Sequence, residues 1–237
     1  MPRPGFSFFE ANVLGTIVNT GAILAGSFAG IAAGKRLPSR IKEILMQGMG
    51  LCIIYLGMSM ALEGENALLT VGAVLLGAVT GELMQIERLL EKLAEKLKNM
   101  MGSASPTFVE GFVTASVIYL VGAMMILGCI DDGVKNDPTL LFIKSILDGV
   151  GSLALASSLG IGVAFSALSV FVVQGALTLT ASHMVFLTEP AVLASLTSVG
   201  GILVMGIGVT ILDVKRIRTA NLLPAIVYAV IGGMLWG

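Results

Sequence analysis

The stretch Leu140–Thr180, LLFIKSILDGVGSLALASSLGIGVAFSALSVFVVQGALTLT, decides the fold of this chain. It is apolar enough to lie in lipid, yet it contains Lys144, Ser145, Asp148 and Gln174. A charged side chain at the centre of a bilayer helix costs roughly 2.5 to 3.5 kcal/mol, so it is seldom kept without a partner or a task. The stretch therefore predicts membrane-spanning helices and, within them, a candidate site.

The composition of the whole chain also points to the lipid bilayer as its environment. Of its 237 residues, 56% are hydrophobic and only 12% are charged, which is typical of a polytopic membrane protein. We expect the lipid bilayer as the main partner, and no nucleic-acid partner because no basic patch is present. Cys52 and Cys129 both fall in apolar runs, so a disulfide framework is not expected. The N-terminal segment lacks the pattern of a cleaved signal, so the first span should stay in the mature protein.

Eight apolar runs are long enough to cross a hydrocarbon core of about 30 Å as helices of about 20 residues. They cover residues 12–34, 45–62, 67–84, 108–130, 140–157, 160–180, 191–212 and 222–236. The sequence thus predicts an all-α polytopic membrane domain over 1–237. The uncharged segment 157–160 between the fifth and sixth runs has two readings: a tight turn between two full spans, or half-helices that meet inside the membrane.

Segment 85–106 differs from the spans. Within it, Leu89, Leu90, Leu93 and Leu97 form one apolar stripe, and six charged side chains lie opposite. The charged residues are Glu87, Glu91, Lys92, Glu95, Lys96 and Lys98. This pattern predicts an amphipathic helix at the membrane surface, followed by a linker and then by a central hairpin over 107–157.

The basic residues predict the orientation. If the N-terminus lies outside, eleven of the fourteen Lys and Arg residues fall on the inner side. They are Lys35, Arg36, Arg40, Lys42, Arg88, Lys92, Lys96, Lys98, Lys215, Arg216 and Arg218. The positive-inside rule then predicts both termini outside and the amphipathic helix in the cytoplasm.

Spans one to three (12–84) resemble spans six to eight (160–237). The best-matching segments place Gly50 on Gly201 and Gly57 on Gly208. Because five spans separate the copies, the two repeats face opposite ways, as in many secondary transporters.

Small residues also recur within the first span, where Gly26, Gly30 and Gly34 share one helix face. Such a face lets another helix approach closely. It serves either packing within the chain or a homo-oligomer, and the sequence alone leaves both open.

Lys144 and Asp148 are the sharpest candidate site residues. They lie one turn apart on the fifth span, with Asp148 about 13 Å deep if the span begins near Thr139. Three readings stay open: a charge pair that only fixes helix packing, a binding site for a cation, a proton or an amine, or two groups that face a wet crevice without touching.

Four further side chains complete the predicted lining. Asn19 and Gln174 are buried amides at nearly equivalent places in the two repeats, although interhelical packing explains them equally well. Ser145 adjoins Lys144, and Glu82 lies at the inner end of the third span.

Several residue patterns are absent from the sequence. It has one histidine, no set of ligands at metal spacing, no GxxxxGK[ST] and no G-x-S-x-G. We therefore expect no catalytic residues, no metal and no cofactor, and a protein that is not an enzyme.

Several blocks carry a family resemblance, and KSILDG and SLGIGV are the most specific of them. The others are NTGAILAGSFAG, KRLPSRIKE, GAVTGE, VGAMMILGCIDDG, QGALTLTA and NLLPA. In this order they resemble the uncharacterised bacterial inner-membrane family of YqgA- and YdfK-like proteins, over essentially the whole chain. The resemblance implies a bacterial cytoplasmic-membrane protein and implies no activity, substrate or cofactor.

Two functions follow as expectations. The first is a secondary transporter or channel for a small polar solute or ion, with its site around Asp148 near the membrane midplane. The second is a membrane scaffold or regulator whose intramembrane polar residues only stabilise helix packing.

Overall fold

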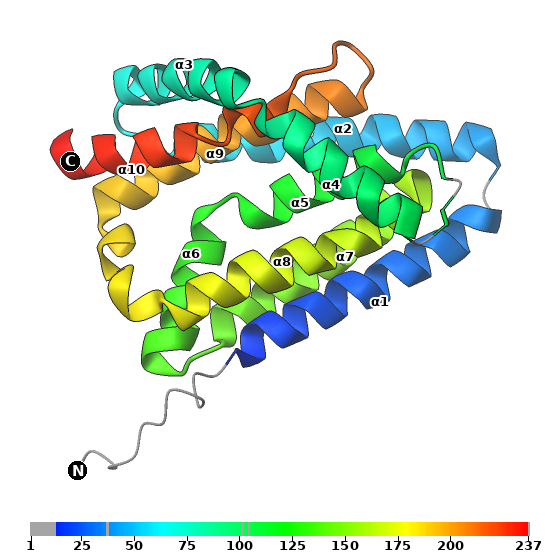
Figure 1. The fold of residues 1–237 in the computed structure, drawn as a ribbon, viewed down its shortest axis with the longest axis horizontal. Helices are drawn as coiled ribbons and strands as arrows, with labels where there is room; N and C mark the ends of the chain where they lie inside the picture. Colours follow the sequence, from blue (N-terminus) through cyan, green and yellow to red (C-terminus); the bar gives the residue numbers. More distant parts are fainter. Residues whose placement is uncertain (1–12, 37, 101, 104, 237) are drawn as a thin grey trace.

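The computed structural model describes residues 13–36, 38–100, 102–103 and 105–236, and this part of the chain is mainly helical and contains no strands (Figure 1). The α-helices are α1 (Leu14–Arg36), α2 (Ser39–Ala61), α3 (Ala67–Met84), α4 (Ile86–Met100), α5 (Phe108–Leu120), α6 (Ala123–Ile130), α7 (Thr139–Leu159), α8 (Ile161–Leu179), α9 (Pro190–Ile211) and α10 (Ala225–Trp236). Short helical turns are η1 (Asp131–Lys135), η2 (Ala181–His183), η3 (Val185–Thr188) and η4 (Thr219–Leu222). Seven helical segments of this part are long and apolar enough to span a membrane, or eight if the bent α5/α6 pair is one span. The prediction of an all-α polytopic membrane protein is confirmed.

The helices pack in two groups. One group contains α1, α7 and α8, which run side by side in Figure 1, and the other contains α2, α3, α9 and α10. Between them lie α5 and α6, with α5 against α8. This arrangement brings the first span against the stretch Leu140–Thr180 that first indicated a membrane protein.

The glycine stripe of α1 explains its close approach to α7. A Cβ on Gly26, Gly30 or Gly34 would clash with a main-chain carbonyl oxygen of α7. These oxygens belong to Gly149, Leu153 and Ser157. The sequence left open whether this face serves packing within the chain or a homo-oligomer. In the structure it packs on α7 of the same chain.

The fourth predicted span is broken. Between α5 and α6 the chain turns by 61°, and Gly122 at the break has a φ of +134°, a conformation that residues with a side chain rarely adopt. The sequence reading treated 108–130 as one continuous run because it is apolar throughout except for Glu110 near its start and contains no proline. In contrast, α7 and α8 are 21 and 19 residues long and only Gly160 separates them, which agrees with two full spans joined by a tight turn.

One end of the bundle gathers four chain segments. The α7–α8 turn lies against the α4–α5 connection, where Thr107 Oγ1 donates a hydrogen bond of 2.8 Å to the Leu159 carbonyl. The N-terminal end of α4 contacts η4 through the Glu87 amide, which donates to Asn221 Oδ1 at 2.7 Å. The α1–α2 connection joins the same end because Gly34 packs on Ser157. We call this end, which carries α4, the α4 end.

One helix boundary differs from the sequence reading. Helix α2 begins at Ser39, directly after Pro38, so most of the basic segment KRLPSRIKE is helical rather than a loop. A proline is tolerated next to the first helical turn because the amide it lacks would have no partner there. The predicted start of the first span at Asn12 lies outside the described residues.

Candidate functional site

A buried ion pair lies at the middle of α7. Asp148 is the tenth of the 21 residues of this helix, and Lys144 Nζ, one turn earlier, contacts its Oδ2. Lys144 is 6% exposed and Asp148 8% exposed. The two side chains touch, so the reading in which both face a crevice without contact is wrong.

Asn19 of α1 connects this pair to α8. Its Nδ2 donates one hydrogen bond to Asp148 Oδ2 and one to Gln174 Oε1, each 2.9 Å long. Gln174 Nε2 in turn donates to Thr16 Oγ1 at 3.2 Å, and the Thr16 and Thr178 hydroxyls lie 3.5 Å apart. Three spans that are distant in sequence thereby share one network of hydrogen bonds.

The network leaves one polar atom without a partner. Asn19 is fully buried, and its Oδ1 accepts no hydrogen bond from any residue that the structure describes. A buried acceptor without a donor is costly, so this atom marks a place where a donor or a cation would be favoured.

Both halves of the broken span, α5 and α6, contact the network. On α5, the Tyr119 ring centroid lies 5.9 Å from Lys144 Nζ, and the Tyr119 hydroxyl is 2.8 Å from Ser152 Oγ. On α6, Cys129 Sγ lies 3.5 Å from the Gln174 carbonyl oxygen and donates to it. The break at Gly122 therefore falls between two contacts with the same polar network.

The structure brings together four of the six predicted site residues, namely Asp148, Lys144, Asn19 and Gln174. Ser145 is buried but donates to the carbonyl of Leu141 in its own helix at 2.6 Å. Glu82 lies at the α4 end, where it accepts hydrogen bonds from Arg218 Nη1 at 2.6 Å and Asn221 Nδ2 at 2.8 Å. It is part of a different cluster from Asp148.

Sequence reasoning missed three groups of the network. Thr16 and Thr178 lie about one helical turn from Asn19 and Gln174, and that spacing is a signal that could have found them. Tyr119 had no such signal, because its place beside Lys144 depends on how α5 packs on α7.

Another buried carboxylate, that of Asp132, lies beside the first turn of α1. Asp132 in η1 is fully buried, and its Oδ2 accepts a hydrogen bond of 3.1 Å from the Gly15 amide. Its Oδ1 has no partner among the described residues. In the sequence, this residue falls between the predicted spans 108–130 and 140–157, and no role was predicted for it.

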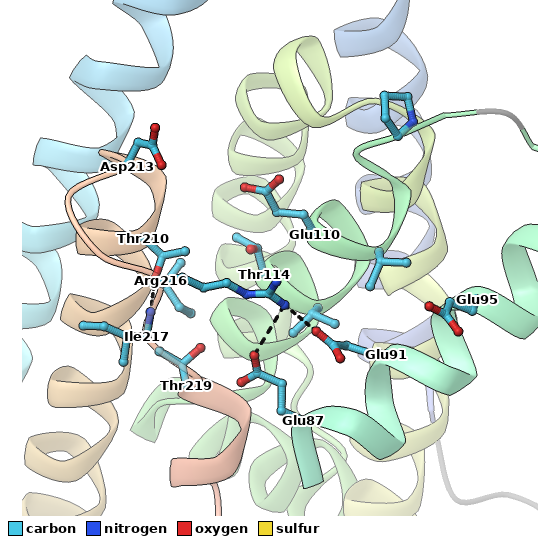
Figure 2. Close-up of a pocket in the computed structure, with 14 residues that line it drawn as sticks. Glu87, Glu91, Glu95, Glu110, Thr114, Thr210, Asp213, Arg216, Ile217 and Thr219 are labelled. Carbon is cyan, nitrogen blue, oxygen red and sulfur yellow. Dashed lines mark hydrogen bonds and ion pairs between the residues drawn. The ribbon is translucent and has the colours of Figure 1, made fainter. Parts of the chain in front are cut away.

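A polar pocket of about 500 Å³ opens at the α4 end, between α4, α5, the end of α9 and the connection to η4 (Figure 2). Its acidic lining residues are Glu87, Glu91, Glu95, Glu110 and Asp213. Arg216 reaches across it, contacting Glu91 and lying 3.8 Å from Glu87. We call this cavity the acidic pocket.

Glu87 is the deepest carboxylate of the acidic pocket. Its side chain is 9% exposed, and Oε2 has no hydrogen-bond partner within the part of the chain described. Burial raises the pKa of Glu87 above its ordinary value, and the charge of Arg216 only partly offsets this effect. The sequence reading put Glu87 on the charged face of α4, opposite the leucine stripe, and did not predict that the first turn of α4 packs on η4 and buries Glu87.

Comparison with known proteins assigns the chain to a family. The model of a family described as a protein of unknown function (DUF554) matches residues 14–234. The uncharacterized membrane protein YdfK of Bacillus subtilis (strain 168) is 32% identical over 218 residues, which cover 90% of this chain and 93% of YdfK. The uncharacterized protein YqgA of Escherichia coli (strain K12) is 29% identical over 229 residues, covering 94% of this chain and 97% of YqgA.

No solved structure matches the chain. The family match runs from the first turn of α1 to the last turn of α10. The chain is therefore a member of the DUF554 family of membrane proteins.

Proposed function

We propose that this protein is a secondary transporter or channel for a small polar solute or ion, with its site at the Asn19–Lys144–Asp148–Gln174 network. The observation that carries the proposal is the broken α5/α6 span, whose two halves contact this network through Tyr119 and Cys129. Discontinuous membrane helices are tolerated where they are buried or line a cavity, and transporters place them at the substrate site near the midplane.

The packing of α2 on α9 supports the inverted repeat that such a function would use. A Cβ on Gly208 would lie 2.9 Å from the Gly50 carbonyl oxygen, and one on Gly57 would lie 2.7 Å from the Gly201 carbonyl oxygen. The sequence alignment exchanges Gly50 with Gly201 and Gly57 with Gly208. Applied to the first contact, this exchange replaces Gly208 with Gly57 and Gly50 with Gly201, which gives the second contact. A two-fold relation between the repeats requires such matching contacts.

The proposed orientation has both termini outside the bacterial inner membrane and the α4 end in the cytoplasm. The last turn of α1, the first turn of α2, helix α4 and the α9–α10 connection together carry eleven of the fourteen basic residues of the chain. Their common location at the α4 end supports this orientation through the positive-inside rule. A cytoplasm-only reporter fused after Gly237 should therefore be silent, and an active fusion contradicts the orientation.

A second candidate function is a membrane scaffold without transport. The observation that favours it is that Lys144 pairs directly with Asp148 and that Asn19 joins Asp148 to Gln174, so these side chains have partners within the bundle. Interhelical hydrogen bonds of this kind stabilise bundles by about 0.6 to 2 kcal/mol each without any task in transport.

Reconstitution of the full chain in proteoliposomes tests the proposal. Gradients of H⁺, Na⁺ and K⁺ are imposed in turn, and flux is followed with pH-sensitive and potential-sensitive dyes, first alone and then with a panel of polar solutes. We expect flux above that of empty liposomes for at least one gradient or solute. Absence of flux under every condition contradicts transport and favours the scaffold.

A further inference from the structure

The acidic pocket carries an inference that is independent of transport. Its acidic side chains outnumber its basic ones: five carboxylates line the cavity, and Arg216 is the one lining residue with a positive charge. A cavity of about 500 Å³ is also within the size range of small-molecule sites, roughly 300 to 1,000 Å³. The charge and the volume together fit a small cationic ligand.

Two observations show that the protein does not neutralise this charge itself. Glu95, Glu110 and Asp213 form no ion pair with any residue in the described ranges. Glu87, more than nine-tenths buried, lines the cavity, and its Oε2 has no hydrogen-bond partner among the residues described. A buried, unsatisfied carboxylate oxygen is costly, and a donor from a cation would remove that cost.

Arg216 marks how such a cation would bind. Its guanidinium lies against Glu91 and near Glu87, yet the side chain is 70% exposed and arises from the connection after α9 (Figure 2). An exposed partner of this kind is easily displaced, because an exposed ion pair contributes only about 0 to 1 kcal/mol. Arg216 thus lies against Glu91 and near Glu87 and leaves the remaining carboxylates of the acidic pocket without an ion pair in the part of the chain described.

The arrangement of the lining favours an organic cation over a metal ion. Among the described residues no three His, Cys, Asp or Glu side chains are close enough to share a metal ion. The carboxylates are instead spread around a cavity that also has an apolar wall of Val109, Val113, Ile207 and Ile217. Separated negative charges along an apolar wall match separated ammonium groups on a methylene chain.

We propose that the acidic pocket binds an alkyl diamine or polyamine, with its ammonium groups on the carboxylates and its methylene chain on the apolar wall. Glu110 and Asp213 lie on different elements that line the cavity, α5 and the connection after α9. Binding would therefore hold the α4 end together by linking these elements through the ligand.

Calorimetric titration of the full chain in detergent with spermidine tests this proposal at physiological ionic strength. We expect saturable binding, weakened about tenfold or more by Glu110→Gln and by Asp213→Asn, because each removes a charge-assisted hydrogen bond. Arg216→Ala should strengthen binding by removing the competing guanidinium. Neutral 1,4-butanediol should not bind.

Glu65→Gln is the matched control, since Glu65 is exposed in the α2–α3 connection and outside the acidic pocket. It removes one carboxylate from the chain and should leave spermidine affinity unchanged. Equal affinities for Glu110→Gln, Asp213→Asn and Glu65→Gln would overturn the proposal, as would absence of saturable binding to the native chain. Because no gradient is involved, this result is independent of whether the protein transports anything.

Discussion

Asn19 Nδ2 lies 2.9 Å from Asp148 Oδ2 and donates a hydrogen bond to it across 129 residues of sequence. The same nitrogen donates to Gln174, so both of its protons are used within the bundle. One amide therefore holds α1, α7 and α8 together at the level of the buried charge. This relationship makes Asn19 the residue on which the geometry of the network depends.

Replacing Asn19 should destabilise the bundle. In Asn19→Ala, Asp148 and Gln174 each lose a donor in a buried setting, and each loss costs about 1 to 3 kcal/mol. We expect a lower midpoint of thermal unfolding in detergent. The control is Thr20→Ala, because Thr20 Oγ1 donates only to the Thr16 carbonyl of its own helix. An equal effect of both variants would contradict the bridging role of Asn19.

The ion pair should show strong coupling between its partners. Lys144→Met leaves the buried Asp148 carboxylate without its counter-charge, which costs about 3 to 5 kcal/mol for a buried pair. Lys144→Met combined with Asp148→Leu removes both charges and should cost less than Lys144→Met alone. The measurement is a double-mutant cycle of unfolding free energies, and additive costs would contradict a direct pair.

The sequence was enough to predict the all-α membrane fold and to place Lys144 one helical turn from Asp148 within a long apolar helix, because helix periodicity and apolar length are local properties. It left open whether the two side chains touch. It was not enough to place Glu82 or Tyr119, since their neighbours depend on which helices pack together. The break at Gly122 also escaped prediction, because its flanks are as apolar as an unbroken span. Glu87 was misplaced for a related reason: helical periodicity defines a polar face but not what packs on it.

The close approach of α1 to α7 should depend on one glycine and not on its neighbour. Gly26→Ala would push a methyl group into the Gly149 carbonyl oxygen, whereas a Cβ on Gly21 meets no atom within 4 Å. We expect Gly26→Ala to destabilise the protein by about 1 to 3 kcal/mol through overpacking. Gly21→Ala should be neutral or stabilising by up to about 1 kcal/mol through helix propensity.

Thermal unfolding of the two purified variants in the same detergent measures this difference. A loss of stability in Gly21→Ala as large as that in Gly26→Ala would show that the α1–α7 contact is not the cause.

The break in the fourth span should depend on the backbone conformation of Gly122. A Cβ there would meet only Met60 Cε, at an ordinary distance of 3.6 Å, so Gly122→Ala introduces little steric conflict with neighbours. The positive φ of this residue is nevertheless costly for alanine, by about 1 to 3 kcal/mol. We expect lower stability in denaturant unfolding, and unchanged stability would mean that the break does not need this conformation.

Glu87 should make stability depend on pH. Burial raises the folded-state pKa of Glu87, so the folded state binds a proton more tightly than the unfolded state does. Its contribution to stability is therefore present below the ordinary pKa of 4.5 and is lost as the pH rises through the folded-state pKa. Relative to the native chain, Glu87→Gln should gain stability as the pH rises across this window.

Unfolding midpoints measured from pH 4 to pH 8 test this trend. If the unfolding midpoint of Glu87→Gln, relative to that of the native chain, falls as the pH rises, the folded state stabilises the charged carboxylate. That result would contradict the effect of burial on Glu87.

Flux through Asp148→Asn proteoliposomes tests the central claim most directly. The variant keeps the shape and a hydrogen-bonding oxygen while removing the buried charge, and Glu189→Gln, an exposed carboxylate without a capping bond, is its control. We predict that Asp148→Asn abolishes the flux of the native chain while Glu189→Gln retains it. Flux that persists in folded Asp148→Asn at the native rate would contradict a transport site at Asp148.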